Sequence, residues 1–192
     1  ERADAEHSYP LLEGREVSEF KVGPPRLFLR PDLEFLARAR CRLRAREEYR
    51  TVRFVVRQTA KVPIAALHSG EPFRNTLLAG FETEEFPASL VVGLLNSSLY
   101  RALHVSRQRD ARQAVFPQVK IAHLRALPRP PSLRMERAAR VRALANLASQ
   151  TGLSKELRRE LDSAVFDLFD FSVSEREQTL AFLVQRAPEL VP

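Results

Sequence analysis

Three prolines within six residues, in the segment LPRPPS (residues 127–132), are the feature that most limits how this chain can fold. Proline lacks a backbone N–H and clashes with the preceding turn, so neither an α-helix nor a central β-strand can run through the segment. We therefore place a boundary here. It separates a first part, residues 1–131, from a helical C-terminal tail, residues 132–192, that packs on the first part or next to it.

The first part alternates helical and strand patterns. Apolar residues at helical spacing predict a helix over residues 31–47, with Pro31 in its first turn, and a second helix over residues 86–104. Segments rich in β-branched and aromatic residues predict strands at residues 49–59, 62–67, 75–81 and 118–124. The expected fold class is α/β (mixed α+β), with a small mixed sheet and flanking helices followed by the helical tail.

The tail shows three helical patterns, at residues 132–150, 153–171 and 174–187. We expect Ser132 and Ser174 to be N-caps, because serine accepts hydrogen bonds from the first free N–H groups of a helix. An apolar stripe marks the face of the tail that enters the core rather than a cofactor site. It consists of Leu157, Leu161, Val165, Phe166, Leu168, Phe169 and Phe171.

The net charge of +7 is unevenly distributed along the chain. Residues 1–131 hold 22 Lys and Arg against 15 Asp and Glu, whereas residues 132–192 hold 9 of each. The excess is concentrated in residues 38–53 and 101–125. Such regions suit contact with phosphate groups. Basic residues also complement helix C-termini or simply face solvent, so charge alone leaves nucleic-acid binding open.

Known catalytic patterns are absent from the sequence. Its six glycines form no phosphate-binding or dinucleotide-binding loop, and its four histidines, which are His7, His68, His104 and His123, lie far apart along the chain. We therefore expect no catalytic residue, metal or cofactor in this chain.

The cellular location follows from what the sequence lacks. Cys41 is the single cysteine, which excludes an intrachain disulfide and fits a reducing compartment. We find no membrane span and no signal peptide pattern, and we expect a cytoplasmic protein. Because the chain opens on Glu1, we expect it to be part of a longer protein.

Five segments in order resemble a known family. They are YPLLEGREVSEF, RFVVRQTA, FRNTLLAGF, LVVGLLNSSLYRALH and FPQVKIAHLRALPRPP. Their order and spacing resemble the TaqI-like C-terminal specificity domain, the target-recognition part of adenine-specific DNA methyltransferases and fused restriction-modification enzymes. The tail segment LDSAVFDLFDFSVSEREQTLAFL is similar to the short helical ending that often follows such domains.

The resemblance implies sequence-specific binding of double-stranded DNA by residues 1–131, as part of bacterial defence. The methyltransferase it serves would flip an adenine out of the duplex. Catalysis and S-adenosylmethionine binding would then belong to a missing domain of the same polypeptide, because the Asn/Asp-Pro-Pro-Tyr/Phe motif and the glycine motif of that domain are absent here. We expect a monomer without membrane contact. A protein-interaction module that docks through its helical tail is the alternative, and a complete enzyme is a third, less favoured hypothesis.

Candidate DNA contacts follow from residue chemistry and from the matched segments, because arginine pairs with guanine and glutamine with adenine. They are Arg57, Gln58, Thr59, Lys61, Arg74, Arg101, Arg107, Gln108, Arg109, Arg112, Gln113, Gln118 and Lys120. The alternative for Arg57, Gln58 and Thr59 is a set of hydrogen bonds to neighbouring loops.

Other polar residues receive weaker expectations. Arg38, Arg42 and Arg46, four residues apart on one predicted helix, suit phosphate contacts or no contact at all. We expect Asn75, Asn96 and Ser97 to be structural. Asn96 lies among leucines, so a hydrogen bond to the backbone is its expected role.

Overall fold

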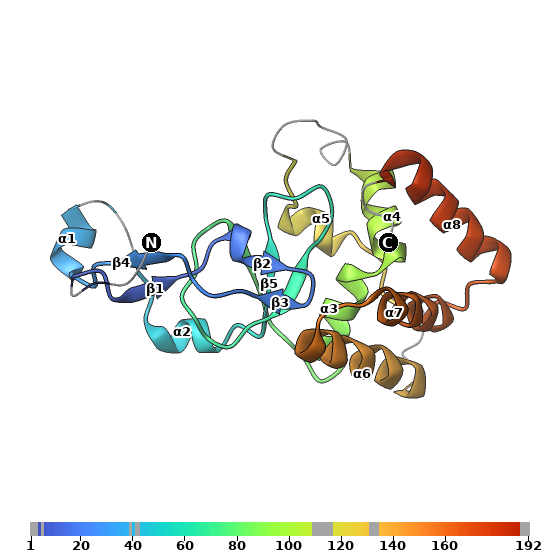
Figure 1. Cartoon of the computed structure of the whole chain (residues 1–192), viewed down its shortest axis with the longest axis horizontal. Helices are drawn as coiled ribbons and strands as arrows, with labels where there is room; N and C mark the ends of the chain where they lie inside the picture. The colour runs from blue at the N-terminus through green and yellow to red at the C-terminus, as the bar shows by residue number, and fades with distance from the viewer. Residues whose placement is uncertain are drawn as a thin grey trace.

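The computed structural model of the 192-residue chain describes residues 4, 6–38, 40, 43–108, 117–130 and 135–188. Its shape is elongated (Figure 1). A small N-terminal β and helix region lies at one end, a three-stranded sheet lies in the middle, and the C-terminal helices lie at the other end. The described residues thus combine helices with small antiparallel sheets, as the predicted fold class requires.

The N-terminal residues form two short antiparallel strand pairs, one toward the end of the molecule and one beside the central sheet (Figure 1). Strand β1 (Tyr9–Leu11) pairs with β4 (Leu27–Leu29), and β2 (Val17–Ser18) pairs with β3 (Lys21–Val22), both antiparallel. A single 3-10 turn (Gly14–Glu16) leads into β2. Phe20 takes a left-handed backbone conformation in the turn between β2 and β3, and its ring is buried.

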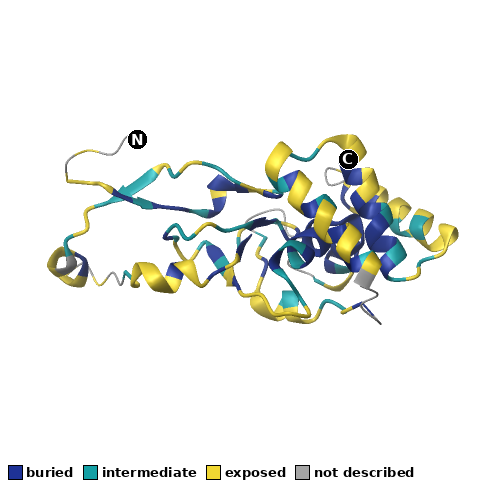
Figure 2. Ribbon diagram, turned by 90° about the horizontal axis from the view of Figure 1, so that it is seen from below, coloured by how far each residue is buried: buried dark blue, intermediate teal, exposed yellow. Residues whose placement is uncertain are grey.

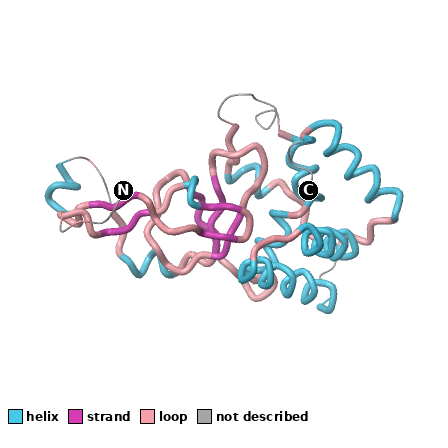
Figure 3. The backbone as a smooth tube through the Cα atoms, viewed as in Figure 1, coloured by secondary structure: helices cyan, strands magenta, loops and turns pink. Residues whose placement is uncertain are grey.

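The central sheet, whose strands are magenta in the middle of Figure 3, has the strand order β6-β5-β7. Strand β5 (Phe54–Arg57) lies between β6 (Ala65–Leu67) and β7 (Leu77–Gly80), antiparallel to both. The sequence predicted a mixed sheet, but every described strand ladder is antiparallel, and parallel pairing is confined to one isolated bridge between Leu12 and Phe73. Only residues 58–64 connect β5 to β6, and such a short connection favours an antiparallel pair, because a parallel pair needs a long crossover.

The predicted helix over residues 31–47 is wrong as a single element. Two short helices form instead, α1 (Leu33–Arg38) and α2 (Arg46–Arg50). Arg40, between them, has a φ of 54°, which no right-handed helix allows. Residues 49–53 accordingly belong to α2 and a turn rather than to the predicted strand.

The helical pattern over residues 86–104 forms two helices, α3 (Ala88–Asn96) and α4 (Ser98–Arg107). Ser97 separates them because its backbone is extended and its hydroxyl accepts the Tyr100 N–H, so it is the N-cap of α4. The predicted strand at residues 118–124 is also wrong. Its second half is the helix α5 (Ile121–Arg125), and only Gln118 makes a β-bridge.

The tail contains α6 (Met135–Thr151), α7 (Lys155–Leu168) and α8 (Val173–Arg186). Ser154 caps α7, and Ser172 caps α8 in a capping box with Glu175, so the prediction of Ser174 as the cap is two residues too late. The predicted cap Ser132 lies outside the described residues.

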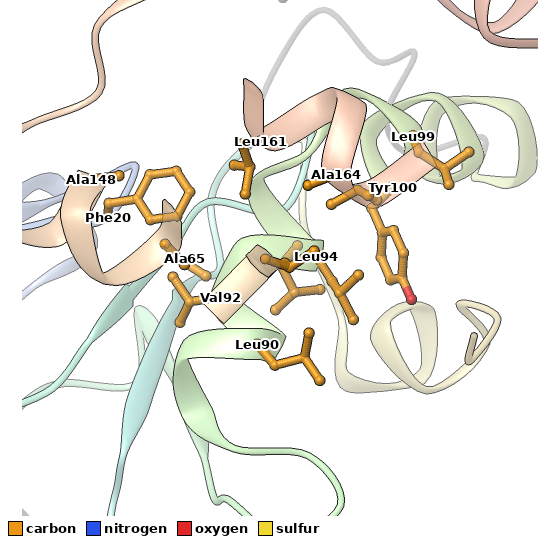
Figure 4. Packing of buried hydrophobic residues seen from close by; sticks show 14 of the residues in the cluster. Phe20, Ala65, Leu90, Val92, Leu94, Leu99, Tyr100, Ala148, Leu161 and Ala164 are labelled. Carbon is orange, nitrogen blue, oxygen red and sulfur yellow. The ribbon is translucent and has the colours of Figure 1, made fainter. Parts of the chain in front are cut away.

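One hydrophobic cluster joins the first part to the tail. It contains Leu90 and Val92 of α3, Ala148 of α6, and Leu161 and Ala164 of α7 (Figure 4). Buried residues accordingly gather at the helical end of the molecule (Figure 2). The tail helices therefore share one hydrophobic core with α3 and α4.

The proline-rich segment is anchored to this helical body. The buried Tyr100 of α4 donates a hydrogen bond of 2.6 Å from its hydroxyl to the Pro128 carbonyl oxygen. Burial raises the pKa of Tyr100, so the hydroxyl keeps the proton that it donates. None of the described helices is long and apolar enough to cross a membrane.

Candidate nucleic-acid interface

Three distant segments meet where β5 ends. The Gln58 N–H donates to the Thr76 carbonyl oxygen (3.0 Å), and the Gln58 carbonyl oxygen accepts the Val119 N–H (2.7 Å). One residue further, Thr59 and Gln118 form an antiparallel bridge. The fold thus places two sets of candidate DNA contacts, residues 57–59 and 118–120, side by side although some 60 residues separate them in sequence.

The side chains at this meeting point alternate between core and solvent, as strand geometry requires. Val119 is completely buried, whereas its neighbours Gln118 and Lys120 are exposed. Thr59, opposite Gln118, is exposed as well. We call Thr59, Gln118 and Lys120 the bridge surface.

Arg57 contacts the backbone of the bridge surface. It is half-buried, and its Nε donates to the Thr59 carbonyl oxygen at 2.9 Å. Hydrogen bonds to neighbouring loops were the alternative to DNA contact for Arg57 and Gln58. The Arg57 Nε and the Gln58 backbone do make such bonds. The terminal nitrogens of the Arg57 guanidinium are not part of this bond.

Lys61 lies two residues after Thr59 of the bridge surface, whereas Arg74 precedes β7. Both are exposed. Arg74 forms an ion pair with Glu13 at 2.6 Å, and its backbone N–H donates to the Leu12 carbonyl oxygen. A surface ion pair of this kind is weak in water, so the arginine can exchange partners at low cost. Asn75, expected to be structural, is exposed beside it.

Arg107 and Gln108 lie at the C-terminal end of α4. The exposed Arg107 donates to the Ala126 carbonyl oxygen at 2.7 Å, and the half-buried Gln108 closes the helix through its backbone N–H. The chain then enters residues 109–116. The predictions for Arg109, Arg112 and Gln113 therefore lie outside the described residues.

Arg101 is withdrawn from the candidate DNA contacts. Only 3% of its surface is exposed, and its guanidinium pairs with Glu19 in the turn between β2 and β3. Burial lowers the pKa of Arg101 to about 10, which leaves the side chain charged at neutral pH. An arginine held inside the protein cannot reach a phosphate or a base edge.

The row of arginines predicted on one helix is not present as such. Arg38 and Arg46 belong to α1 and α2 respectively, and Arg42 lies outside the described residues. Arg46 is exposed, and its guanidinium lies 5.1 Å from the centre of the Tyr9 ring, which is a cation–π contact.

A largely buried polar network connects the first part of the chain to α7 of the tail. It was not predicted from the sequence. Glu19 pairs with both Arg101 and Arg158, and Arg158 also donates to the Asn96 carbonyl oxygen at 3.3 Å. Asp162, one turn further along α7, accepts hydrogen bonds from Ser98. The signal that could have revealed this network is the pair Arg158 and Asp162, two charged residues one turn apart among the leucines of one helical face.

Asn96 has the structural role expected from its leucine-rich surroundings. It is fully buried, its Oδ1 accepts the Ala65 N–H (3.0 Å), and its Nδ2 donates to the Ala65 carbonyl oxygen (2.8 Å). The Asn96 amide thus makes the two hydrogen bonds to the Ala65 backbone that a neighbouring strand would make, and these bonds tie α3 to β6.

The rings of His104 and His123 are neighbours, although no sequence pattern pairs the two residues. Their ring centres are 5.6 Å apart. His104 is 1% exposed, and neither of its ring nitrogens has a hydrogen-bond partner among the described residues. Burial, with His123 nearby, lowers the pKa of His104 to about 4. Within the described part of the chain, no three His, Cys, Asp or Glu residues gather closely enough to hold a metal.

Residues of β7, α5 and the N-terminal region line an apolar groove. Its volume is about 1740 Å³, and its lining includes Leu78, Phe81, Phe86 and Ile121. Arg129, also in the lining, lies over the Phe86 ring at 5.3 Å. The groove was not predicted, because the N-terminal region and α5 form its walls only in the folded chain.

The family model described as the TaqI-like C-terminal specificity domain matches residues 9–128. The chain belongs to this family. The matched stretch contains the whole sheet, α3, α4 and the bridge surface, whereas α6, α7 and α8 lie beyond it. No curated protein matches the chain. Membership identifies the chain as a DNA-recognition specificity domain of the kind found in restriction-modification enzymes, and as a specificity module rather than a catalytic one.

Proposed function

We propose that this chain selects the DNA site for an adenine-specific DNA methyltransferase or a fused restriction-modification enzyme. It binds double-stranded DNA sequence-specifically, while the methyltransferase domain of the same polypeptide flips and methylates the adenine. The enzyme acts as a monomer in the bacterial cytoplasm. The observation that supports this most is the bridge surface, because it joins two separate candidate DNA-contact segments within the stretch that matches the family.

S-adenosylmethionine belongs to the catalytic domain in this proposal. The residues of this chain do not fit the cofactor, since its six glycines form no nucleotide-binding loop and the groove beside β7 is mainly apolar. The chain alone therefore transfers no methyl group from labelled S-adenosylmethionine to DNA. Robust transfer by the chain alone would overturn this assignment.

The DNA-binding part of the proposal is tested with a library of duplexes that carry a randomised central block. We expect the chain to enrich one short sequence, with an affinity at least about a thousandfold above that for unrelated duplexes. The binding constant should fall steeply as salt rises, because bound phosphates release counterions. Equal affinity for every duplex, or no binding in low salt, would contradict the proposal.

A protein-interaction module is the second candidate, and the surface of α8 favours it. Val173, Leu180 and Val184 are exposed on this helix at a spacing that places them on one side. This function requires a defined complex without DNA and no shift of any duplex in an electrophoretic assay. Replacing Leu180 and Val184 with serine separates the two candidates, because it should leave sequence-specific DNA binding unchanged if recognition resides in the bridge surface.

A further inference from the structure

We infer that Thr59 and Gln118 together read one A·T base pair through the major groove of the DNA. The inference rests on the proposed function and deepens it, because it assigns the base-reading role to one pair of residues among the candidates. The starting observation is that the two residues lie directly opposite each other in an antiparallel bridge and that both side chains face solvent.

The geometry of the bridge places the two side chains next to each other on one face. Directly opposed residues of an antiparallel pair have Cβ atoms about 4.5–5.5 Å apart on the same face. A single base-pair edge therefore lies within reach of both. The major groove of B-form DNA admits a two-stranded β-ribbon, whereas its minor groove is too narrow and shows a degenerate pattern of donors and acceptors.

The chemistry of the pair selects adenine and thymine. A glutamine amide donates to N7 of adenine and accepts from its N6 amino group in a bidentate arrangement. The threonine methyl group packs against the C5 methyl group of thymine, which only this base carries. Both features lie on the major-groove edge of one A·T pair. Arginine or lysine in these positions would instead favour guanine.

The backbone beneath the pair is fixed before DNA binds. Val119 is fully buried next to Gln118, and its N–H donates to the Gln58 carbonyl oxygen at 2.7 Å. The Arg57 Nε holds the Thr59 carbonyl oxygen at 2.9 Å. Since these contacts do not use the side chains of Thr59 and Gln118, little conformational freedom of the backbone remains to be lost on binding.

Positively charged side chains beside Thr59 and Gln118 favour contact of this surface with DNA phosphates. Lys61 and Lys120 are exposed two residues from Thr59 and Gln118 respectively. Phosphate contacts position a protein on the duplex without reading its sequence, whereas the paired polar side chains carry the sequence information. The two roles predict different mutational effects.

The test compares wild-type chain with Gln118→Ala and Gln118→Glu in selection from the randomised duplex library. Wild type should select A·T at one position. Gln118→Ala should lose about 10- to 100-fold of the preference at that position and keep the preferences elsewhere. Gln118→Glu should shift the preference at the same position toward cytosine, because a carboxylate accepts a hydrogen bond from the N4 amino group of that base.

Gln150→Ala, which removes an exposed glutamine of α6, is the matched control and should change no preference. Thermal unfolding of each variant verifies its fold, and Gln118→Glu keeps the test decisive if Gln118→Ala is unstable. Unchanged preference at every position, or an equal loss of affinity for all duplexes, would overturn the inference while leaving DNA recognition intact. Absence of any selection by the wild type would instead overturn the proposed function.

Discussion

The carboxylate of Asp162 accepts two hydrogen bonds from Ser98, one from its backbone N–H (2.7 Å) and one from its hydroxyl (2.6 Å). The two residues are 64 positions apart, and both are buried. Ser98 is the first residue of α4, where backbone N–H groups lack helical partners, so a carboxylate from the tail satisfies the start of a helix in the matched family segment.

Replacing Asp162 with alanine should lower the free energy of unfolding by about 2–4 kcal/mol. The change leaves the buried Ser98 donors without an acceptor and the buried Arg158 without its neighbouring carboxylate. Urea unfolding followed by circular dichroism measures the effect. Glu160→Ala, an exposed change on the same helix, should stay within about 0.5 kcal/mol of wild type. Equal stability of the two variants would show that the Ser98 contact is energetically unimportant.

A chain that ends at residue 131 should not fold cooperatively. Removing the tail would expose Leu90, Val92 and Leu94 of α3, because α6 and α7 cover that helix. Calorimetry should show no unfolding transition for residues 1–131, and an exposed-surface dye should bind them strongly. A sharp transition for this fragment would mean that the matched family segment is an independent domain.

Replacing Gly93 with alanine should destabilise the chain by about 1 kcal/mol, although alanine is the better helix former. A Cβ at this position would lie 2.9 Å from Val141 Cγ1 and 3.3 Å from Ala145 Cβ, so α3 and α6 would have to separate. Combining Gly93→Ala with Val141→Ala should cost clearly less than the sum of the two single changes. Simple additivity in urea unfolding would show that Gly93 does not set the distance between the helices.

The stability of the chain should fall between about pH 6.5 and pH 4 because of His104. Its folded-state pKa is lowered to about 4 by burial, while the unfolded chain takes up the proton near pH 6.5. Protons therefore bind the unfolded state preferentially in this interval, and up to about 3 kcal/mol present above pH 6.5 is lost on acidification. His104→Gln should flatten the pH dependence of urea unfolding over the interval. An unchanged slope in that variant would assign the acid sensitivity to other groups.

Arg107 and Arg101 should behave differently although both were candidate DNA contacts. Arg107→Ala, at an exposed site, should weaken binding to all duplexes and reduce the salt dependence by about one phosphate contact. Arg101→Ala should instead lower the free energy of unfolding by about 2–4 kcal/mol, since it removes a buried side chain and leaves the half-buried Glu19 with one cation fewer. Binding by anisotropy and unfolding in urea, measured for both variants, distinguish the two roles. Similar effects of both changes in both assays would contradict the assignment.

Sequence patterns were reliable where a structural property depends on neighbouring residues. Strands β5, β6 and β7 lie within segments predicted as strands from their residue types, and α3, α4 and the tail helices match the predicted helical segments to within three residues at their outer ends. The family followed from five ordered segments, and the buried role of Asn96 followed from the leucines around it. The long N-terminal helix failed because arginine favours helices locally, but few apolar residues in that segment have a core to pack against.

The sequence alone determined the central strands, the helices outside the N-terminal region and α5, the uneven charge and the family, since each is set by local pattern or by ordered composition. Tertiary structure alone decided which arginines face solvent, because Arg101 and Arg107 are chemically identical and lie on the same helix. It also placed Gln118 beside Thr59, and Asp162 beside Ser98. Contacts between residues some 60 positions apart depend on how sheet and helices pack around one core, and no local pattern encodes that packing.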